Sequence, residues 1–135
     1  MTSVYPAKSP FIIPVHWNPP PPGWLKINID GAAKGSPGHA GCDGIFRTCR
    51  GFVKSTFSIY LGIKFVFEAE LTGLILAIEI ASKLNWNNLW VESDPEYAVY
   101  SLKHRSHNVP WPLRNRWLNS LLLADKMNVK ISHIF

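Results

Sequence analysis

The sequence predicts one α/β domain in which helices flank a mixed five-stranded sheet. Three strand-like stretches come first and are joined by short turns, a pattern typical of an antiparallel meander. The later strand-like stretches alternate with helices, and a strand that follows such a helix usually returns parallel to an earlier strand. Between the two halves lies a long helix that is apolar on nearly every side, as the centre of such a domain requires.

The first half of the domain supplies the three antiparallel strands. In residues 24–30 (WLKINID) apolar and polar residues alternate, which is the period of a half-buried strand. Residues 31–41 contain four glycines and one proline, so we expect a loop there. Residues 42–48 and 51–62 are the second and third predicted strands, with an Arg-Gly turn between them.

The central helix is predicted over residues 68–84 (EAELTGLILAIEIASKL). Apolar residues recur at helical spacing on one side, and further leucine, isoleucine and alanine residues fill the other. Its first turn nevertheless carries Glu68 and Glu70. An acid in that turn is also explained by favourable pairing with the helix dipole. The asparagines of residues 85–88 mark the end of the helix.

The second half alternates strands with helices. The fourth strand, residues 88–94, has Leu89 and Val91 on one face and Trp90 on the other, and we expect it to run parallel to the first. The Asp-Pro pair at its end is a typical helix start, because aspartate caps the helix and proline fits its first position. The remaining elements are a helix over 95–104, a loop over 105–112, a helix over 113–127 and a strand over 129–135.

Composition sets the class of protein. The 135 residues are 47% hydrophobic and 13% aromatic, which is enough for a packed core. We divide the chain into a proline-rich tail or linker, residues 1–23, and the domain, residues 24–135. The tail could also be the ligand of a proline-recognition module.

Charge and targeting signals narrow the setting. The net charge of +5 leans towards a polyanionic partner without proving one. Cys42 and Cys49 match no metal-ligand spacing, and we interpret them as reduced thiols. No apolar run has the length of a membrane span, and the N-terminus lacks the apolar stretch of a secretory signal. We therefore expect a nuclear or cytoplasmic monomer that is not secreted and contacts no membrane.

Three carboxylates fall where the predicted elements begin or end. Asp30 closes the first strand, Asp94 closes the fourth, and Glu70 lies in the first turn of the central helix. If the two strands are parallel neighbours, these acids meet at one edge of the sheet. Clustered carboxylates repel one another without a cation, and oxygen ligands suit magnesium or manganese. From spacing alone two alternatives stay open: Asp94 as a helix cap, and Asp30 as a turn residue before a glycine.

The motifs together carry more than spacing does. The stretch WLKINIDGAAKGSPGHAG, followed by GIFRTCRG, AELTGLILAIEIA and LWVESD, resembles the ribonuclease H-like domain of plant retrotransposon polyproteins and their plant relatives. The resemblance extends over residues 19–135, and the upstream PPPPGW is also similar to the lead-in of that family. It implies a ribonuclease H-like fold with a five-stranded mixed sheet, in agreement with the element order above.

The resemblance implies a function and a set of site residues. The family cuts the RNA strand of an RNA–DNA hybrid with two magnesium ions. Asp30, Glu70 and Asp94 match its metal-binding, catalytic carboxylates, with the carbonyl of Gly31 close by, and manganese is the alternative ion. Glu68 is the weaker match because it precedes the alanine of the motif. We therefore expect a ribonuclease H-type endonuclease that binds nucleic acid.

The glycine-rich loop is implied to touch the hybrid through Lys34 and Ser36. Recognition would then rest on 2′-hydroxyl groups and backbone shape more than on base edges. The sequence departs from the family at Ser36, where asparagine is common, and at Asp43, where glycine is favoured. Residues 65–67 are Phe-Val-Phe in place of polar residues that often grip the hybrid.

The family also has a fourth acid in a helix after the last strand. This sequence ends at Phe135, before such a stretch, so we expect the fold without that C-terminal helix. A rival hypothesis follows, in which the chain is a catalytically impaired nucleic-acid-binding or interaction remnant of a retroelement domain. His133 is interpreted as a structural residue of the last strand.

A basic segment, residues 103–116, allows two interpretations. It contains His104, His107 and Trp111 among its lysines and arginines, as a loop that grips phosphates beside an aromatic platform would. The alternative, which we favour, is an ordinary solvated surface with Trp111 in the core.

Overall fold

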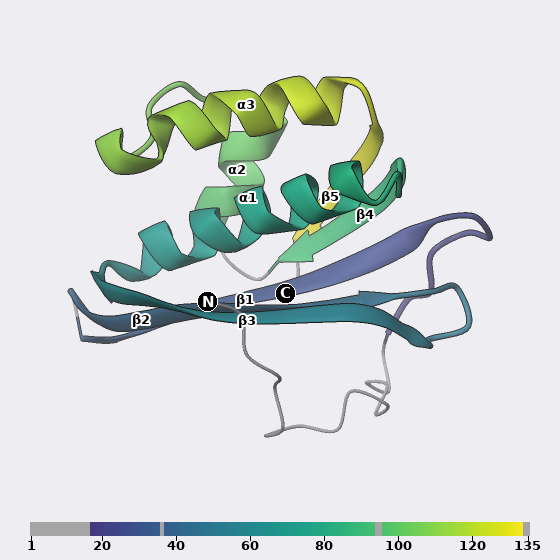
Figure 1. Ribbon diagram of the computed structural model, residues 1–135, viewed down its shortest axis with the longest axis horizontal. Helices are drawn as coiled ribbons and strands as arrows, with labels where there is room; N and C mark the ends of the chain where they lie inside the picture. The colour runs from purple at the N-terminus through teal and green to yellow at the C-terminus, as the bar shows by residue number, and fades with distance from the viewer. Residues whose placement is uncertain (1–16, 36, 94–95, 134–135) are drawn as a thin grey trace.

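The computed structural model describes residues 17–35, 37–93 and 96–133. In this part of the chain a five-stranded sheet, with strand order β3-β2-β1-β4-β5, carries its helices on one face (Figure 1). The elements are β1 (Leu25–Gly35), β2 (Gly38–Arg47), β3 (Val53–Lys64), α1 (Val66–Lys83), β4 (Asn88–Ser93), α2 (Glu96–Lys103), the single-turn 3-10 helix η1 (Trp111–Leu113), α3 (Arg114–Asp125) and β5 (Asn128–His133).

The strand directions confirm the predicted mixed sheet. β2 pairs antiparallel with both β1 and β3, whereas β4 pairs parallel with β1 and β5. The helices α1, α2 and α3 make the crossovers that parallel pairing requires. None of the helices in the described part of the chain has the length and hydropathy that a membrane span needs.

The loop predicted over residues 31–41 is wrong. β1 and β2 stay paired through this stretch, from Gly31 opposite Cys42 to Gly35 opposite Gly38, and only the tip turns. Gly35 has a φ of +107°, a conformation that glycine adopts without the steric cost of a side chain. Glycine therefore permits the tight tip of the hairpin. Pairing of the two strands outweighs the weak strand propensity of the glycines along them.

The position of α1 explains why its sequence is apolar on nearly every side. The helix lies between the sheet and α3 (Figure 1), and it also contacts α2. Its buried residues face both layers, and only Leu76 and Ile80 among its large apolar side chains beyond the first turn are half-exposed. Asn85, with a φ of +59°, ends the helix as predicted. The core consists of Ile27, Ile29, Phe46, Phe57, Leu71, Leu74, Ile75, Ile78, Leu89, Val91 and Trp117, with smaller residues between them.

The charged side chain of Lys26 is buried on the opposite face of the sheet. Alternation along β1 turns Lys26 away from the helices, yet its side chain is 0% exposed. Its Nζ lies 3.9 Å from the centre of the Trp90 ring and 5.4 Å from that of Trp17. The amine forms an ion pair with Glu92 at 3.1 Å and donates to the carbonyl oxygen of Asn18 at 2.7 Å. The residues just before β1 therefore cover part of this face.

The expectation that Trp111 is a core residue is wrong. Its side chain is 81% exposed, in a 3-10 turn none of whose residues is buried. Trp117, in the first turn of α3, takes the core position instead, and its Nε1 donates to the carbonyl oxygen of Ser106 at 2.6 Å. The physical reason is that α3 begins at Arg114, so the stripe that packs on α1 starts after the 3-10 turn.

Candidate functional site

Asp30 does not close its strand, because β1 continues for five residues beyond it. The neighbouring strand β4 supplies the edge instead. Its described pairing with β1 ends at Ser93 opposite Ile29, so Asp30 lies one residue beyond the last β1–β4 pair. The carboxylate is exposed on the face of the sheet that the helices leave uncovered. Asp30 therefore lies within β1, still paired with β2 and just beyond the described pairing of β1 with β4.

Gly31 brings the first turn of α1 against β1. A Cβ atom built on Gly31 would lie only 2.7 Å from the backbone nitrogen of Glu70 and 2.9 Å from the carbonyl carbon of Ala69. Only glycine permits such an approach of two backbones. As a result, the backbone of Glu70 touches Gly31, the residue after Asp30, and the Glu70 side chain is half-buried. The structure therefore places the backbone of Glu70 beside the residue that follows Asp30.

Glu68 has a different task. Its Oε1 accepts a hydrogen bond of 3.0 Å from the backbone N–H of Phe65, the residue before the helix. This is the carboxylate half of a capping box, and it satisfies a donor that the helix leaves free. The structure thus separates the roles of two acids that lie two residues apart. Glu68 begins the helix, and Glu70 remains the candidate for the site.

Two predicted site residues, Asp94 and Ser36, lie outside the described residues. Among the described residues, no group of three or more histidine, cysteine, aspartate or glutamate side chains could hold a metal ion. The sequence places Asp94 directly after Ser93, which pairs with Ile29. The metal-binding role of Asp30, Glu70 and Asp94 therefore stays a prediction.

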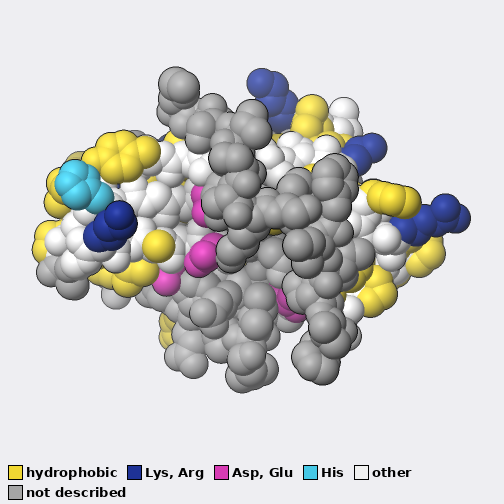
Figure 2. All heavy atoms as spheres, turned by 90° about the horizontal axis from the view of Figure 1, so that it is seen from below, with side chains coloured by type: hydrophobic (Ala, Val, Ile, Leu, Met, Phe, Trp, Pro, Cys, Tyr) yellow, Lys and Arg dark blue, Asp and Glu magenta, His cyan; other side chains and the backbone are white. Residues whose placement is uncertain are grey.

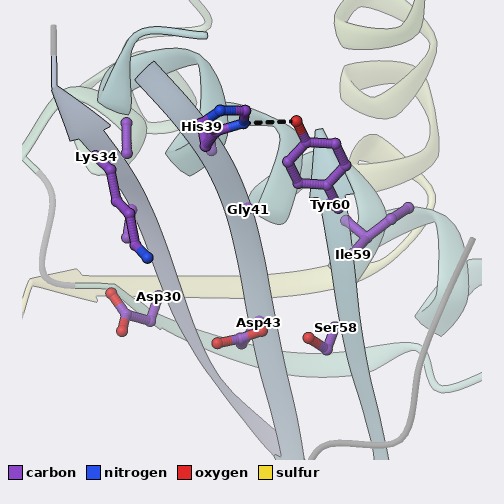
Figure 3. Close-up of a pocket in the computed structure, with 11 residues that line it drawn as sticks. Asp30, Lys34, His39, Gly41, Asp43, Ser58, Ile59 and Tyr60 are labelled. Atoms are coloured by element: carbon purple, nitrogen blue, oxygen red, sulfur yellow. Dashed lines mark hydrogen bonds between the residues drawn. The ribbon is translucent and has the colours of Figure 1, made fainter. Parts of the chain in front are cut away.

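An acid that the sequence showed only as a departure from the family lies beside Asp30. Asp43 of β2 is the direct cross-strand partner of Asp30, and Ser58 of β3 is the partner of Asp43 (Figure 3). Like charges directly opposite one another weaken a sheet. Asp43 therefore adds negative charge beside Asp30, where the sequence predicts a bound metal ion.

An open pocket of about 580 Å³ extends from this row along β1, β2 and β3. Besides Asp30 and Asp43, it is lined by Lys34, His39 and Tyr60. Nδ1 of His39 and the hydroxyl of Tyr60 are joined by a hydrogen bond of 2.8 Å (Figure 3). Figure 2 shows the molecule from below: a histidine lies beside a basic and several hydrophobic side chains at one end, further basic side chains lie towards the other end, and acidic ones lie nearer the middle.

Sequence reasoning identified Lys34 in this pocket and missed His39 and Tyr60. The signal was present, since His39, Gly41 and Asp43 alternate on β2, while Ser58 and Tyr60 alternate on β3. Assigning residues 31–41 to a loop interrupted the first of these patterns. Once the hairpin is extended, the five positions fall on one face.

At the start of α1 the Phe-Val-Phe departure forms an apolar surface. The rings of Phe65 and Phe67 are stacked, with centroids 5.5 Å apart and planes 15° apart. Phe65 and Val66 are 39% and 44% exposed. The side chains of residues 65 and 66 therefore offer no polar group to a nucleic-acid backbone.

Solved structures share this architecture. The ribonuclease H domain at the N-terminus of a Mycobacterium tuberculosis protein matches with a TM-score of 0.73 at 23% identity, over 82% of this chain and 86% of that one. Ribonuclease H1 of Halobacterium salinarum matches with a TM-score of 0.70 at 22% identity, over 83% and 86%. The compost-derived LC11 ribonuclease H1, solved with an RNA/DNA hybrid, matches with a TM-score of 0.69 at 21% identity, over 82% and 84%. The fold is thus ribonuclease H-like.

The sequence comparison is more specific. Residues 28–135 match the family described as reverse transcriptase-like, and the chain belongs to that family. An Arabidopsis thaliana protein named "Putative ribonuclease H protein" is 32% identical over 122 residues, which are 90% of this chain. The match covers 20% of that relative, so the chain spans about a fifth of its length.

Proposed function

We propose that the domain is an RNA–DNA hybrid ribonuclease that hydrolyses the RNA strand in a metal-dependent, endonucleolytic reaction. Asp30, Glu70 and Asp94 are its catalytic carboxylates, and two magnesium or manganese ions are its cofactors. The observation that carries the proposal is the contact of Gly31 with the backbone of Glu70, because it places the start of the Glu70 side chain beside the residue that follows Asp30.

The donor set fits the implied ions. Carboxylate oxygens and a backbone carbonyl, as at Gly31, are the hard ligands that magnesium and manganese prefer. When bound, two such ions supply an activated water and stabilise the leaving oxygen of a phosphodiester. The protein's contribution is to hold Asp30 and Glu70 on rigid elements, a paired strand and the first turn of a packed helix, so that little reorganisation is needed.

Hybrid binding is proposed on the same face of the sheet. Lys34 is exposed within the pocket that begins at Asp30, and a cation there attracts a phosphate of the backbone. We keep Ser36 in this role from the sequence. Recognition through backbone shape and 2′-hydroxyl groups agrees with the small number of charged side chains in the pocket.

The rival function is nucleic-acid binding without turnover. The apolar start of α1, with Phe65 and Val66 exposed, favours it, because the side chains that grip the hybrid in the family are altered at these positions. Asp43 also favours it, because this departure from the family lies directly opposite a proposed catalytic acid.

The test is cleavage of a hybrid labelled on its RNA strand, with magnesium, by the purified protein and three variants. Glu70→Gln removes the proposed ligand, whereas Glu68→Gln alters a carboxylate two residues away that caps the start of the helix. We expect cleavage by the wild type and by Glu68→Gln, and a loss of at least about 100-fold in Glu70→Gln and in Asp30→Asn.

Circular dichroism spectra must be unchanged in each variant. Equal cleavage by Glu70→Gln and the wild type would remove Glu70 from the site. A folded wild type that binds the hybrid and leaves it intact would overturn the catalytic proposal in favour of the rival.

A further inference from the structure

The pocket beside Asp30 has a second half that the proposed chemistry does not use. Ala32 and Gly41 are cross-strand partners, and Gly41 is in turn the partner of Tyr60. Because one of these residues carries a single methyl group and the next has no side chain, the row leaves a hollow on the open face of the sheet. Asp30 and Asp43 bound this hollow on one side, and the Tyr60 ring lies at its other end (Figure 3).

The rings of His39 and Tyr60 form one broad surface. Their hydrogen bond joins the edge of the imidazole to the phenol hydroxyl at 2.8 Å. The ring centroids are 6.1 Å apart and the planes differ by only 28°, so the rings lie side by side rather than face to face. Tyr60 is 64% exposed, which leaves a face of its ring accessible. The hydrogen bond also fixes the orientation of both side chains before any ligand binds.

Charge gives this surface a direction. Lys34 is the cross-strand partner of His39, and its side chain extends along β1 so that the amine points towards Asp30 (Figure 3). A phosphate is attracted to this amine, whereas the carboxylates beyond it exclude a phosphate that has no cation with it. A nucleotide whose base lies on the rings thus has its phosphate between the rings and the candidate catalytic acids.

We propose that the His39–Tyr60 surface, together with Lys34, is a stacking site for an unpaired nucleotide next to the hybrid. Inside a duplex both faces of each base are covered by its neighbours, so only a base beyond the paired region can stack on a protein ring. The site would therefore bind a single-stranded overhang where the hybrid ends. This inference rests on the proposed hybrid binding and assigns it a preferred substrate, a hybrid with a single-stranded extension.

The experiment compares the affinity of the protein for a blunt RNA–DNA hybrid with its affinity for hybrids that carry four unpaired nucleotides. Each strand is extended in turn at each end, and dissociation constants are measured by fluorescence anisotropy without magnesium. We expect one of these overhangs to tighten binding about fivefold or more, the effect of stacking one base on an aromatic ring. The same overhang without bases, made of abasic nucleotides, should give no gain.

Three variants assign the gain to the rings. Tyr60→Leu keeps bulk and removes the ring, so the gain should vanish. Tyr60→Phe keeps the ring and removes only the hydrogen bond to His39, so most of the gain should remain. Phe52→Leu is the matched control, because Phe52 is also 64% exposed but lies at the opposite end of the β2–β3 hairpin.

The outcomes separate this inference from the function on which it rests. If no overhang tightens binding, or if the gain survives in Tyr60→Leu or with abasic nucleotides, the stacking site is overturned while hybrid binding stands. If neither blunt nor extended hybrids bind to the folded wild type, the proposed function fails, and the stacking site fails with it.

Discussion

At the scale of single residues, Lys26 shows how a strand position acquires a role that its neighbours define. Its amine is enclosed by the Trp90 ring, by Trp17, and by its ion pair with Glu92. A buried cation costs desolvation free energy unless partners of this kind replace the water. The tryptophan faces contribute through their electrostatic attraction for the charge. Lys26 therefore links β1 to β4 and to the residues that precede β1.

Replacing Lys26 with methionine tests this enclosure. The change keeps the volume and leaves Glu92, whose side chain is 16% exposed, without its cation. We expect Lys26→Met to lower the free energy of unfolding by about 2 kcal/mol, measured by urea denaturation. The exposed pair of Arg105 and Asp125 is the control, and Arg105→Gln should cost less than about 0.5 kcal/mol. Equal losses in the two variants would contradict the role of burial.

Cys42 gives the fold a pH dependence. Burial, and after it the charge of Asp43, raises the pKa of the Cys42 thiol from 9.0 to about 12. The folded protein thus keeps the thiol protonated at a pH where the unfolded chain has lost the proton. Stability from this residue is fully present below pH 9 and falls as the pH rises towards 12.

The corresponding prediction concerns alkaline unfolding. Between pH 9 and 10.5 the wild type should lose about 2 kcal/mol more of its free energy of unfolding than Cys42→Ala does, at about 1.4 kcal/mol per pH unit. Comparing slopes cancels the other groups that titrate in this range. Cys49→Ala should retain the wild-type slope, and parallel profiles for the wild type and Cys42→Ala would refute the assignment to Cys42.

At the scale of elements, the packing of α1 on the sheet depends on a glycine in the middle of the helix. A Cβ atom at Gly73 would lie 2.6 Å from Cγ2 of Ile29, in β1, and 3.4 Å from Cβ of Cys42, in β2. Glycine lowers helix stability by about 1 kcal/mol relative to alanine. Its presence is explained by the close approach of helix and sheet, which holds the first turn of α1 near Asp30.

Gly73→Ala should therefore destabilise the protein by about 1 to 2 kcal/mol, because the clash with Ile29 exceeds the gain in helix propensity. Leucine has no branch at Cβ, so Ile29→Leu removes the clashing methyl group while keeping the volume. In thermal or urea unfolding, the double variant should lose less free energy of unfolding than the two single variants lose together, by at least about 1 kcal/mol. Strict additivity would show that the two side chains do not meet.

At the scale of the whole molecule, the two faces of the sheet differ in what they can bind. The helices cover one face of the sheet, and the other carries the pocket with Asp30, Lys34 and Tyr60. The net charge is +5, so hybrid binding should weaken as salt rises. The acids of the pocket reduce that attraction locally, so the loss of one lysine on this face should weaken binding measurably.

Salt dependence measures the contribution of Lys34. On a plot of log Kd against log salt concentration for a blunt hybrid, Lys34→Gln should reduce the slope by about one unit. Lys83 is the control, because it is an exposed lysine in the last turn of α1, at the opposite end of that helix from Glu70. An unchanged slope in Lys34→Gln, or an equal change in Lys83→Gln, would remove Lys34 from the binding face.

The sequence by itself determined the types and the order of the elements, the parallel return of β4, and the candidate acids Asp30 and Glu70. Periodicity and helix-end signals are local properties, so they can be read without knowing what packs on what. The role of Asp94, which lies outside the described residues, is still a prediction from sequence.

Only the tertiary structure decided the rest. Cross-strand pairing extended β1 and β2 through the glycine-rich stretch. The neighbours of Lys26 bury its side chain, and Trp111, which was expected in the core, is exposed. The close contact at Gly31 and the ring pair of His39 and Tyr60 join residues from different elements. Burial, close approach and pocket shape depend on which surfaces meet in space, and the spacing of residues along one strand or helix does not contain that information.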